Sequence, residues 1–423
     1  MNKIQYGQFF TEKDELIESI EKSYKIEENN VTNEFYLCNL FNSLNENSET
    51  GNRDDITTPM ECVKKMIDYI PEEFWFRNHI RILDPCCGNG NFGAYCSLKT
   101  NIDNIYFNEI NYDRYKMCKK ILNPKNITND DAFNIFNSNE KFDLIMANPP
   151  YSGGGNKNQS LSNKFIEASI DILNENGYLC YVTPNNWMTY NNHNKILKKL
   201  LENGEFIVID NDCKKYFSGV GSSFTILIWQ KTKIKKTTFV NNNYLIKDTQ
   251  FVNIPKDAIF IPLYLSQEMF SIIKKSFSKE RNVFNYRCDL HNFTKKENLR
   301  DVKDEKFKYE TIHTIKKMRY ANIKQNIYDK WIIVVPLSTY FIPFIEHNKN
   351  TTQSVGYIQF NSKKEATEFL TKLQKKYIKV LIHITRFGNF NNIKVLKHII
   401  FNEPKFTKKE FNLIETLAKK IKY

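Results

Sequence analysis

Polar side chains follow four short apolar segments in the first half of the chain, at the point where each segment ends. These side chains are Asp84, Glu109, Asp130 with Asp131, and Asn148. Apolar segments that alternate with amphipathic helical stretches predict parallel strands joined by helices. The carboxyl ends of parallel strands meet at one edge of a sheet, where open α/β folds bind their ligands. The sequence therefore predicts an α/β fold with a ligand site at that edge.

A glycine-rich turn follows the first of these segments. Residues 80–84 are mostly apolar and end in an acid, and residues 85–93 (Pro-Cys-Cys-Gly-Asn-Gly-Asn-Phe-Gly) then lead into a predicted helix. In a strand, turn and helix of this kind, backbone N–H groups approach a ligand closely. Glu109 ends the next segment, where dinucleotide-binding folds place an acid that binds both hydroxyls of a ribose. These features predict a site for a nucleoside ligand.

The tetrapeptide Asn148-Pro149-Pro150-Tyr151 ends the fourth segment, residues 141–147. Two prolines fix the backbone and remove two N–H donors, which leaves carbonyl groups and the Asn148 amide oxygen as acceptors. Tyr151 adds a flat aromatic face. This arrangement predicts a site for a planar exocyclic amine. An ordinary turn is the alternative, because Asn-Pro and Pro-Pro are common turn dipeptides.

The elements on either side of these motifs follow from local patterns. Residues 58–67 predict a helix with Thr58 as its N-cap, Pro59 at the first helical position and Glu61 completing a capping box. Further along, the pattern predicts helices around 164–170 and 194–201 and strands at 178–182, 206–209 and 225–229. The whole series predicts a doubly wound sheet with a hairpin at its edge.

Charge is unevenly distributed along the chain, whose formal net charge is +13. Residues 231–423 contain 38 Lys and Arg and 17 Asp and Glu, a net charge of +21, whereas residues 1–230 contain 23 and 31, a net charge of −8. A biased composition alone does not explain such a contrast within one chain. A basic half beside a mildly acidic one indicates that one half binds a polyanion and the other carries the chemistry.

Together these residues resemble the Rossmann-like S-adenosylmethionine-dependent methyltransferases, specifically the gamma class of DNA adenine-N6 methyltransferases found in type II restriction-modification systems. Thr58-Pro59 is similar to the family's motif X, and Asp84 to Gly90 is similar to its Asp-Pro-x-Cys-Gly-x-Gly motif. The resemblance covers approximately residues 53–230. Residues 7–11 (Gly-Gln-Phe-Phe-Thr) also resemble an opening of motif X but lie too far upstream, so the spacing favours Thr58.

The resemblance implies S-adenosylmethionine as the cofactor, without a metal. Glu109 would bind the ribose hydroxyls, and Asp131 or its neighbour Asp130 would accept a hydrogen bond from N6 of the cofactor adenine. Phe165 would pack on that adenine, although a core position on a helical stripe is an equal alternative. The residues that correspond to the family's cofactor site are Thr58, Pro59, Asp84, Pro85, Cys86, Gly88, Gly90, Glu109, Asp130, Asp131, Asn148 and Phe165.

The resemblance also implies a target adenine that flips out of duplex DNA to reach the pocket. The Asn148 amide oxygen and the Pro149 carbonyl would bind its two N6 hydrogens, with Pro150 fixing the backbone beside them. Tyr151 would stack on one face of the flipped base and Phe217 on the other. A core role is the alternative for Phe217, since an aromatic residue beside a strand is commonly buried.

Three domains are expected. They are a partly helical N-terminal arm at 1–50, a catalytic domain at 51–232 and a basic α+β target-recognition domain at 233–423, which would bind double-stranded DNA at a short specific sequence. A cognate restriction endonuclease, where one exists, is expected on another polypeptide. Nine scattered cysteines, the lack of a membrane-length apolar run and the lack of a signal peptide predict a cytoplasmic protein that makes no membrane contact.

Other functions remain open at this point. An RNA adenine-N6 methyltransferase would use the same pocket chemistry. The methyltransferases that modify glutamine in release factors also contain Asn-Pro-Pro-Tyr, but they lack a large basic C-terminal module. A non-catalytic DNA-binding or specificity protein with this fold is a third alternative, and the intact acids and motif glycines argue against it.

Overall fold

The computed structural model describes residues 38–43, 57–151, 161–190, 194–217, 223–278, 286–287, 297–338, 340–386, 390–402 and 404–421. The chain divides into two compact units. The first comprises Met1–Pro184 and Lys198–Phe239, and the second comprises Asn185–Leu197 and Val240–Tyr423. Most of the expected N-terminal arm, including residues 7–11, lies outside the described residues. The expected boundary between residues 232 and 233 lies within eight residues of the division between Phe239 and Val240.

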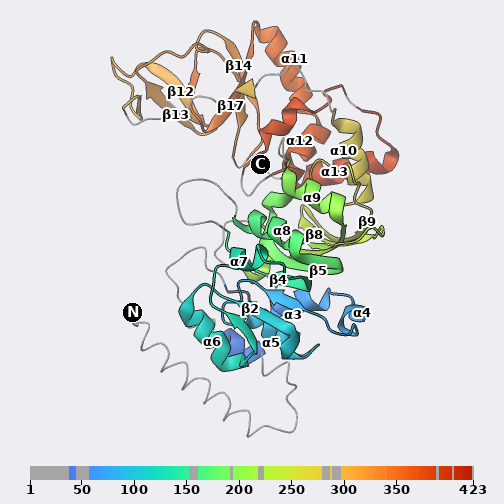
Figure 1. The fold of residues 1–423 in the computed structure, drawn as a ribbon. Coiled ribbons are helices and arrows are strands. Elements are labelled where there is room, and N and C mark those ends of the chain that lie inside the picture. The colour runs from blue at the N-terminus through green and yellow to red at the C-terminus, as the bar shows by residue number, and fades with distance from the viewer. Residues whose placement is uncertain are drawn as a thin grey trace. The chain divides into compact units, whose positions relative to one another are not determined.

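The first unit contains a mixed sheet with the strand order β3-β2-β1-β4-β5-β7-β6. The first five strands in this order run parallel, and β7 pairs antiparallel with both β5 and β6. Figure 1 labels β2, β4 and β5 of this sheet, and β1 lies between β2 and β4. The strands are β1 (Ile82–Asp84), β2 (Ile105–Asn108), β3 (Asn126–Thr128), β4 (Phe142–Ala147), β5 (Leu173–Pro184), β6 (Glu205–Asp210) and β7 (Phe224–Gln230). The predicted α/β fold is therefore confirmed, and β6 and β7 form an antiparallel hairpin.

Helices alternate with these strands. They are α3 (Met60–Asp68), α4 (Glu72–Trp75), α5 (Asn91–Cys96), α6 (Tyr112–Leu122), α7 (Ala132–Phe136), α8 (Leu161–Ile172) and α9 (Lys195–Asn203). The observed bounds agree with the predicted ones to within a few residues, except that β5 begins at Leu173 rather than at Tyr178. Leu173 pairs with Phe142 before the register shifts and Tyr178 pairs with Leu144, which extends the strand.

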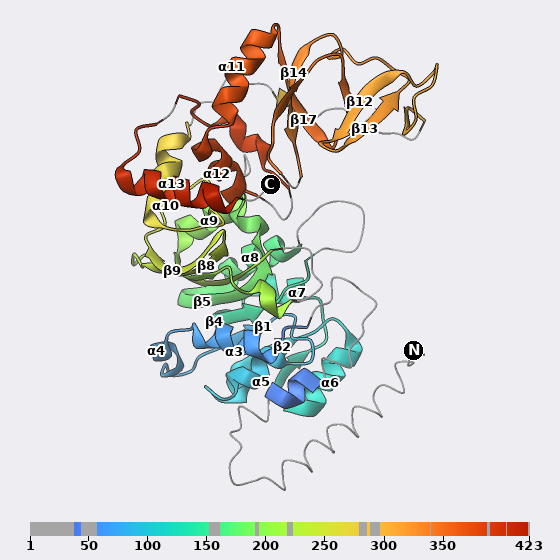
Figure 2. The same ribbon diagram turned by 180° about the vertical axis from the view of Figure 1, so that it is seen from behind.

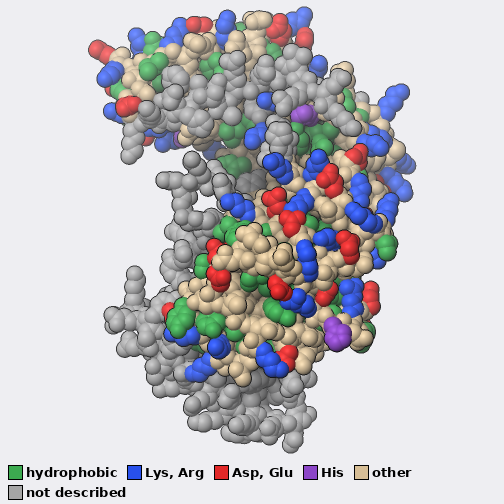
Figure 3. Space-filling model, viewed as in Figure 1, with side chains coloured by type: hydrophobic (Ala, Val, Ile, Leu, Met, Phe, Trp, Pro, Cys, Tyr) green, Lys and Arg blue, Asp and Glu red, His purple; other side chains and the backbone are tan. Residues whose placement is uncertain are grey.

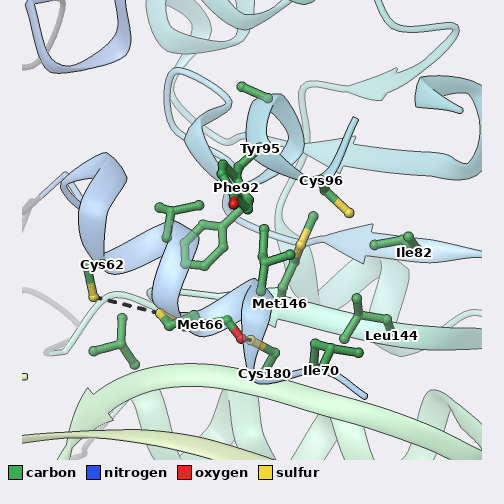
Figure 4. Close-up of a cluster of buried hydrophobic side chains, with 14 of the residues drawn as sticks. Cys62, Met66, Ile70, Ile82, Phe92, Tyr95, Cys96, Leu144, Met146 and Cys180 are labelled. Atoms are coloured by element: carbon green, nitrogen blue, oxygen red, sulfur yellow. Dashed lines mark hydrogen bonds between the residues drawn. The ribbon is translucent and has the colours of Figure 1, made fainter. Parts of the chain in front are cut away.

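The two faces of the sheet pack against different helices. Side chains alternate between the faces of a strand, and β5 shows this directly. The Cys180 thiol lies 3.6 Å from the Met66 carbonyl of α3, whereas the Tyr181 hydroxyl lies 2.7 Å from Ser169 Oγ of α8. Figure 4 shows the core on the first face, where Met66 and Cys180 lie close to side chains of α5 and β4. Figure 2 gives the view of α3 and α5 from behind.

The predicted start of α3 is wrong by one residue. Pro59 is the N-cap and Met60 the first helical residue, and no side chain of the cap makes a capping hydrogen bond. The capping box expected from Thr58 and Glu61 is therefore not formed. Instead, the backbone N–H of Met60 donates to Oδ1 of Asn42, at 3.1 Å, from a helical segment at residues 38–43. An acceptor distant in sequence satisfies the donor that the local motif was expected to satisfy.

The second unit combines helices with short strands, as expected for an α+β domain. The hairpin of β8 (Thr238–Tyr244) and β9 (Ile246–Val252) precedes two four-stranded sheets, β10-β17-β14-β15 and β11-β13-β12-β16. The strands of these sheets are β10 (Tyr286–Arg287), β11 (Leu299–Arg300), β12 (Tyr309–Thr314), β13 (Lys317–Ala321), β14 (Trp331–Pro336), β15 (Phe344–Glu346), β16 (Asn350–Thr351) and β17 (Val355–Phe360). The helices are α10 (Gln267–Ser276), α11 (Lys363–Leu373), α12 (Lys376–Ile384) and α13 (Lys408–Lys420).

The surface carries both signs of charge. On the face drawn in Figure 3, Lys and Arg side chains are interspersed with those of Asp and Glu. No helix in the described part of the chain is both long enough and apolar enough to span a membrane.

Candidate active site

The glycine-rich turn after β1 is tied to the acid that ends β2. The backbone N–H of Gly88 donates to Oε2 of Glu109, and the N–H of Asn111 donates to Oε1, each at 2.8 Å. Because β1 and β2 are parallel neighbours, Asp84 and Glu109 meet at the same edge of the sheet, as predicted. A carboxylate oxygen can accept more than one hydrogen bond, so these contacts are compatible with the predicted binding of ribose hydroxyls, which stays a prediction.

Gly88 and Gly90, the two glycines of the turn, are required for different structural reasons. Both have positive φ values, 58° at Gly88 and 97° at Gly90. A Cβ atom built on Gly88 would have no described heavy atom within 4 Å beyond its chain neighbours, so this residue faces open space. A Cβ atom on Gly90 would lie 2.7 Å from Cδ1 of Leu122 and 2.9 Å from Sγ of Cys118. Gly88 is therefore the residue that leaves room for a ligand, and Gly90 allows the turn to pack against α6.

Asp84 is the least satisfied polar side chain in this region. It is fully buried, and neither carboxylate oxygen has a hydrogen-bond partner of good geometry in the described structure. Burial raises the pKa of Asp84 well above its ordinary value, and the nearby Glu109 acts in the same direction. The backbone N–H of Cys86 opposes this shift only in part. A buried acceptor beside an open glycine turn fits a site for a ligand with N–H donors.

Asn108, the last residue of β2, holds neighbouring loops together. Its Nδ2 donates to the carbonyls of Pro85 and Asp130, at 3.1 and 2.9 Å, and its Oδ1 accepts from the Thr128 hydroxyl at 2.8 Å. The turns after β1 and β3 are therefore fixed to the end of β2.

Asp130 and Asp131 lie at the predicted edge and are exposed. Oδ1 of Asp131 caps α7 by accepting from the N–H of Phe133 at 2.9 Å, and Oδ1 of Asp130 accepts from Nδ2 of Asn134 at 2.8 Å. Their predicted contact with an adenine amine stays a prediction.

Phe165 of α8 is buried in an aromatic cluster. Its ring lies edge-to-face against Phe133 and Phe136, with centroids 5.2 and 5.3 Å apart. The structure therefore places Phe165 in the core, which was one of the two alternatives, next to the loop that carries Asp131. Phe133, a member of this cluster, is only half-buried.

The tetrapeptide after β4 forms a defined local structure. The Tyr151 hydroxyl donates to Oδ1 of Asn148 at 2.7 Å, and the Cys86 thiol lies 3.7 Å from the Asn148 carbonyl oxygen. Burial raises the pKa of Tyr151, which keeps the hydroxyl a protonated donor. An amide oxygen can accept two hydrogen bonds, so the bond from Tyr151 orients the oxygen that was predicted to bind an amine.

The rings of Tyr151 and Phe217 belong to one aromatic group, because both contact Phe224, a residue that the sequence analysis missed. The ring of Phe224 lies 5.1 Å from that of Tyr151 and 5.0 Å from that of Phe217, centroid to centroid. Phe224 begins β7, opposite Pro184 of β5, and it is buried, as is Phe217. The only sequence signal for Phe224 was its place directly before the strand predicted at 225–229.

A buried ion pair lies at the end of β6. Nζ of Lys65 on α3 is 2.5 Å from Oδ2 of Asp210, and the Tyr69 hydroxyl donates to the same oxygen at 2.7 Å. The N–H of Asp212 donates to the other carboxylate oxygen. These contacts join the helix that begins at the motif X residues to the loop that leads to Phe217. Local sequence patterns gave no sign of the pair, because its members are far apart in the chain.

Comparisons with known proteins agree with this geometry. Residues 92–217 match the family model described as the Eco57I restriction-modification methylase. This match covers less than half of the chain.

Two curated relatives align with about a third of the chain. A release factor glutamine methyltransferase from Mycoplasma mycoides is 27% identical over 128 residues, 29% of this chain and 45% of the relative. The type II methyltransferase M.VspI from Vibrio sp. (strain 343) is 26% identical over 178 residues, 36% of this chain and 42% of the relative. The chain thus spans less than half the length of either relative.

Among solved structures, the cryo-electron microscopy structure of the DrdV–DNA complex superposes with a TM-score of 0.55. The sequence identity is 10%, and the superposition covers 82% of this chain and 54% of the other. At this identity the likeness concerns the fold.

The family match and the fold imply S-adenosylmethionine as the cofactor. The residues at the sheet edge fit it: Gly88 leaves space, Glu109 presents carboxylate oxygens, and Asp84 offers buried acceptors without partners. The chain is similar to the Eco57I restriction-modification methylase family over residues 92–217, which include Glu109.

Proposed function

We propose that this protein is a site-specific DNA methyltransferase of the gamma class, which transfers a methyl group to N6 of an adenine flipped out of duplex DNA. The observation that carries the proposal is the hydrogen bond from Tyr151 to Oδ1 of Asn148 at the carboxyl end of β4. This bond would hold the amide oxygen ready to act together with the Pro149 carbonyl, at the end of a strand that pairs with β1, the neighbour of β2.

The chemistry follows from the acceptors that this tetrapeptide presents. The lone pair of an adenine N6 is delocalised into the ring, which makes the amine a poor nucleophile. Two acceptors, Oδ1 of Asn148 and the carbonyl of Pro149, would bind the two N6 hydrogens and favour a more tetrahedral nitrogen. S-adenosylmethionine, when bound, supplies an activated methyl group. Orientation and electrostatics then provide most of the catalysis, and a dedicated general base is not required.

The aromatic group would hold the flipped base. A base that stacks on an aromatic side chain gains about 1–3 kcal/mol. Tyr151 and Phe217 are the proposed partners, and Phe224 contacts both of them. Phe217 and Phe224 are buried in the structure, as the core alternative for Phe217 expected. Phe224 would therefore support the Tyr151 ring, and stacking of the base on Phe217 would require the Phe217 ring to become accessible.

Duplex DNA is favoured as the substrate by the basic half of the chain. Residues 231–423 carry a net charge of +21, which suits a phosphate backbone and predicts steep dependence of binding on salt. The structural likeness to a DNA complex covers 82% of the chain, more than the catalytic unit alone. The similarity to the type II methyltransferase M.VspI also favours DNA as the substrate.

Two other methyl acceptors remain candidates. The similarity to a release factor glutamine methyltransferase favours a glutamine side chain, whose planar amide would suit the same acceptors. That similarity spans 29% of the chain and leaves the basic half without a role. RNA adenine is the other candidate, because the pocket chemistry would be the same.

A transfer assay with three acceptors separates these functions. The full chain is incubated with S-adenosylmethionine labelled in the methyl group and with duplex DNA, RNA or a release factor, each in excess. We expect label on the DNA, at a short sequence that single-molecule sequencing identifies. Label on RNA or on the release factor alone would move the function to that alternative.

A further inference from the structure

The hairpin formed by β12 and β13 extends beyond the four-stranded sheet to which it belongs. On one side, β16 pairs only with Thr311 and Ile312 of β12. On the other side, β11 pairs only with Tyr320 and Ala321 of β13. Residues 314–318, which close the hairpin, therefore pair with no third strand among those that the structure describes. Figures 1 and 2 show this hairpin at one end of the second unit.

The projecting end of the hairpin begins at a fixed base. Nδ1 of His313 lies 2.9 Å from Oγ1 of Thr352, and the register of the two strands shifts at this point, between Ile312 and Thr314. A bulge of this kind bends and twists a hairpin, and so sets the direction of the side chains beyond it. Within the turn, the backbone N–H of Lys316 donates to Oγ1 of Thr314 at 3.3 Å. The end of the hairpin therefore has a defined direction and a defined turn.

This end combines apolar side chains with lysines. Residues 314–318 are all exposed, and among them Ile315 and Met318 are each 37% exposed. Lys316 and Lys317 lie between these two residues in the chain. Single exposed apolar residues are common on proteins, whereas apolar side chains gathered at the end of a projecting hairpin indicate an interaction surface.

The charges around this end leave it positive. Oδ1 of Asp301 lies 2.8 Å from Nε of Arg319 and 3.4 Å from Nζ of Lys317, so one carboxylate faces two cations of β13. Glu310 of β12 is paired with Lys349. The turn adds a further lysine. This excess of positive charge complements a polyanion, and it favours a nucleic acid over an apolar protein surface as the partner.

We infer that the end of the β12–β13 hairpin enters the major groove of duplex DNA, where Lys316 and Lys317 contact phosphates and Ile315 and Met318 contact base edges. The major groove admits a two-stranded β-ribbon, and apolar side chains in it recognise the methyl group of thymine. The lysines would supply affinity for any sequence, and the apolar pair a preference for one sequence. The inference rests on the proposed function, because it names the segment that recognises the DNA.

The salt dependence of binding tests the role of the lysines. The Kd of the full chain for a fluorescent duplex of random sequence is measured by anisotropy between about 50 and 200 mM salt. In Lys316→Ala/Lys317→Ala, the slope of the logarithm of the association constant against the logarithm of the salt concentration should be smaller in magnitude by about 2. The matched control is Lys364→Ala/Lys372→Ala, which removes two exposed lysines from α11 and should leave the slope as in the wild type.

Ile315→Ser/Met318→Ser tests the apolar contacts, on the duplex sequence that the transfer assay identifies. We expect a severalfold higher Kd for this sequence with an unchanged salt slope, and an unchanged Kd for the random duplex. Phe411→Ser is the control, because Phe411 is an apolar residue of α13 that is 49% exposed. It should change neither Kd.

The outcomes separate this inference from the proposed function. The inference is wrong if Lys316→Ala/Lys317→Ala has the slope of the wild type, or loses no more slope than the α11 control, and a wild type that still methylates DNA would then leave the proposed function intact. A smaller slope in the hairpin variant alone supports the inference even if the wild type methylates no DNA, a result that would contradict only the proposed function. A wild type that does not bind duplex DNA would overturn both.

Discussion

The hydroxyl of Tyr151 donates a hydrogen bond to the amide oxygen of Asn148, at 2.7 Å, across a turn that contains two prolines. Donor and acceptor are only three residues apart, and the prolines remove much of the backbone freedom between them. The side chain proposed to bind the target amine is therefore oriented before any substrate arrives. Preorganisation of this kind reduces the reorganisation needed in the transition state.

Tyr151→Phe tests the bond while it keeps the aromatic ring. Loss of one neutral hydrogen bond costs about 0.5–1.5 kcal/mol, so we expect kcat for DNA methylation to fall by about 2- to 13-fold. The Kd for S-adenosylhomocysteine should not change. Steady-state kinetics and calorimetry give the two values. A variant with the kcat of the wild type would show that the bond does not orient Asn148.

Asn148→Ala removes the proposed acceptor. Leaving a buried amine without its hydrogen-bond partner costs about 1–3 kcal/mol or more. The rate of methyl transfer should therefore fall ~5- to 150-fold or more, while cofactor binding persists. Asn137→Ala is the control, since Asn137 is exposed at the end of α7. Retained activity in Asn148→Ala would contradict the assignment of Asn148 to the catalytic pocket.

Phe224→Leu keeps an apolar side chain at the start of β7 but removes the ring that contacts Tyr151 and Phe217. We expect a severalfold higher KM for DNA, because the aromatic surface for the base loses its central member. Fluorescence of 2-aminopurine at the target position should report less flipped base. Phe206→Leu truncates an equally buried ring that faces Trp229, and it should lower stability without changing the KM.

Lys65→Met leaves the buried carboxylate of Asp210 without its cation. The Asp210 side chain is 0% and the Lys65 side chain 25% exposed. Breaking a fully buried pair costs about 3–5 kcal/mol, and the partial exposure of Lys65 lowers the expected loss to about 1–3 kcal/mol. Urea unfolding of the wild type and the variant measures it. The double variant Lys65→Met/Asp210→Asn should recover part of the lost stability. If it recovers none, the lost stability did not come from the unpaired charge of Asp210.

His383 predicts a dependence of stability on pH. Burial lowers the pKa of His383 to about 4, and the nearby Arg386 and Lys379 act in the same direction. Between the ordinary histidine pKa of about 6.5 and this value, the unfolded chain binds a proton that the folded protein does not. The contribution of His383 to the free energy of unfolding is therefore lost as the pH falls from about 6.5 to about 4.

The measurement is a comparison of thermal unfolding at pH 7 and pH 5 for the wild type and His383→Gln. The variant should lose less stability than the wild type on acidification. His79→Asn is the control, because His79 is exposed and asparagine tolerates its positive φ of 56°. An equal loss in His383→Gln and the wild type would show that this histidine does not titrate as expected.

Much of the site could be predicted because it depends on local patterns. Apolar segments that end in Asp84, Glu109 and Asn148 predict strands whose ends meet, and the parallel pairing of β1 with β2 and β4 brings them together. Short apolar segments alternating with amphipathic helical stretches were sufficient for that prediction. The error in such reasoning lies at element ends, as at the start of α3, where a shift of one residue changes the hydrogen bonds.

The rest depends on contacts between residues that are distant in the sequence. Asn42 satisfies the donor at the start of α3 that a local capping box was expected to satisfy. Phe224 joins Tyr151 to Phe217, and Lys65 pairs with Asp210. No periodicity or propensity encodes such contacts, because they form only when the sheet has assembled.

The most direct test of the central proposal is to digest duplex DNA to nucleosides after incubation with the protein and S-adenosylmethionine, and to identify the methylated nucleoside by mass spectrometry. We predict N6-methyldeoxyadenosine with the wild type and a strongly reduced amount with Asn148→Ala. Methylation of cytosine would contradict the assigned pocket, and DNA without any methylated base, together with a methylated release factor or RNA, would contradict DNA as the substrate.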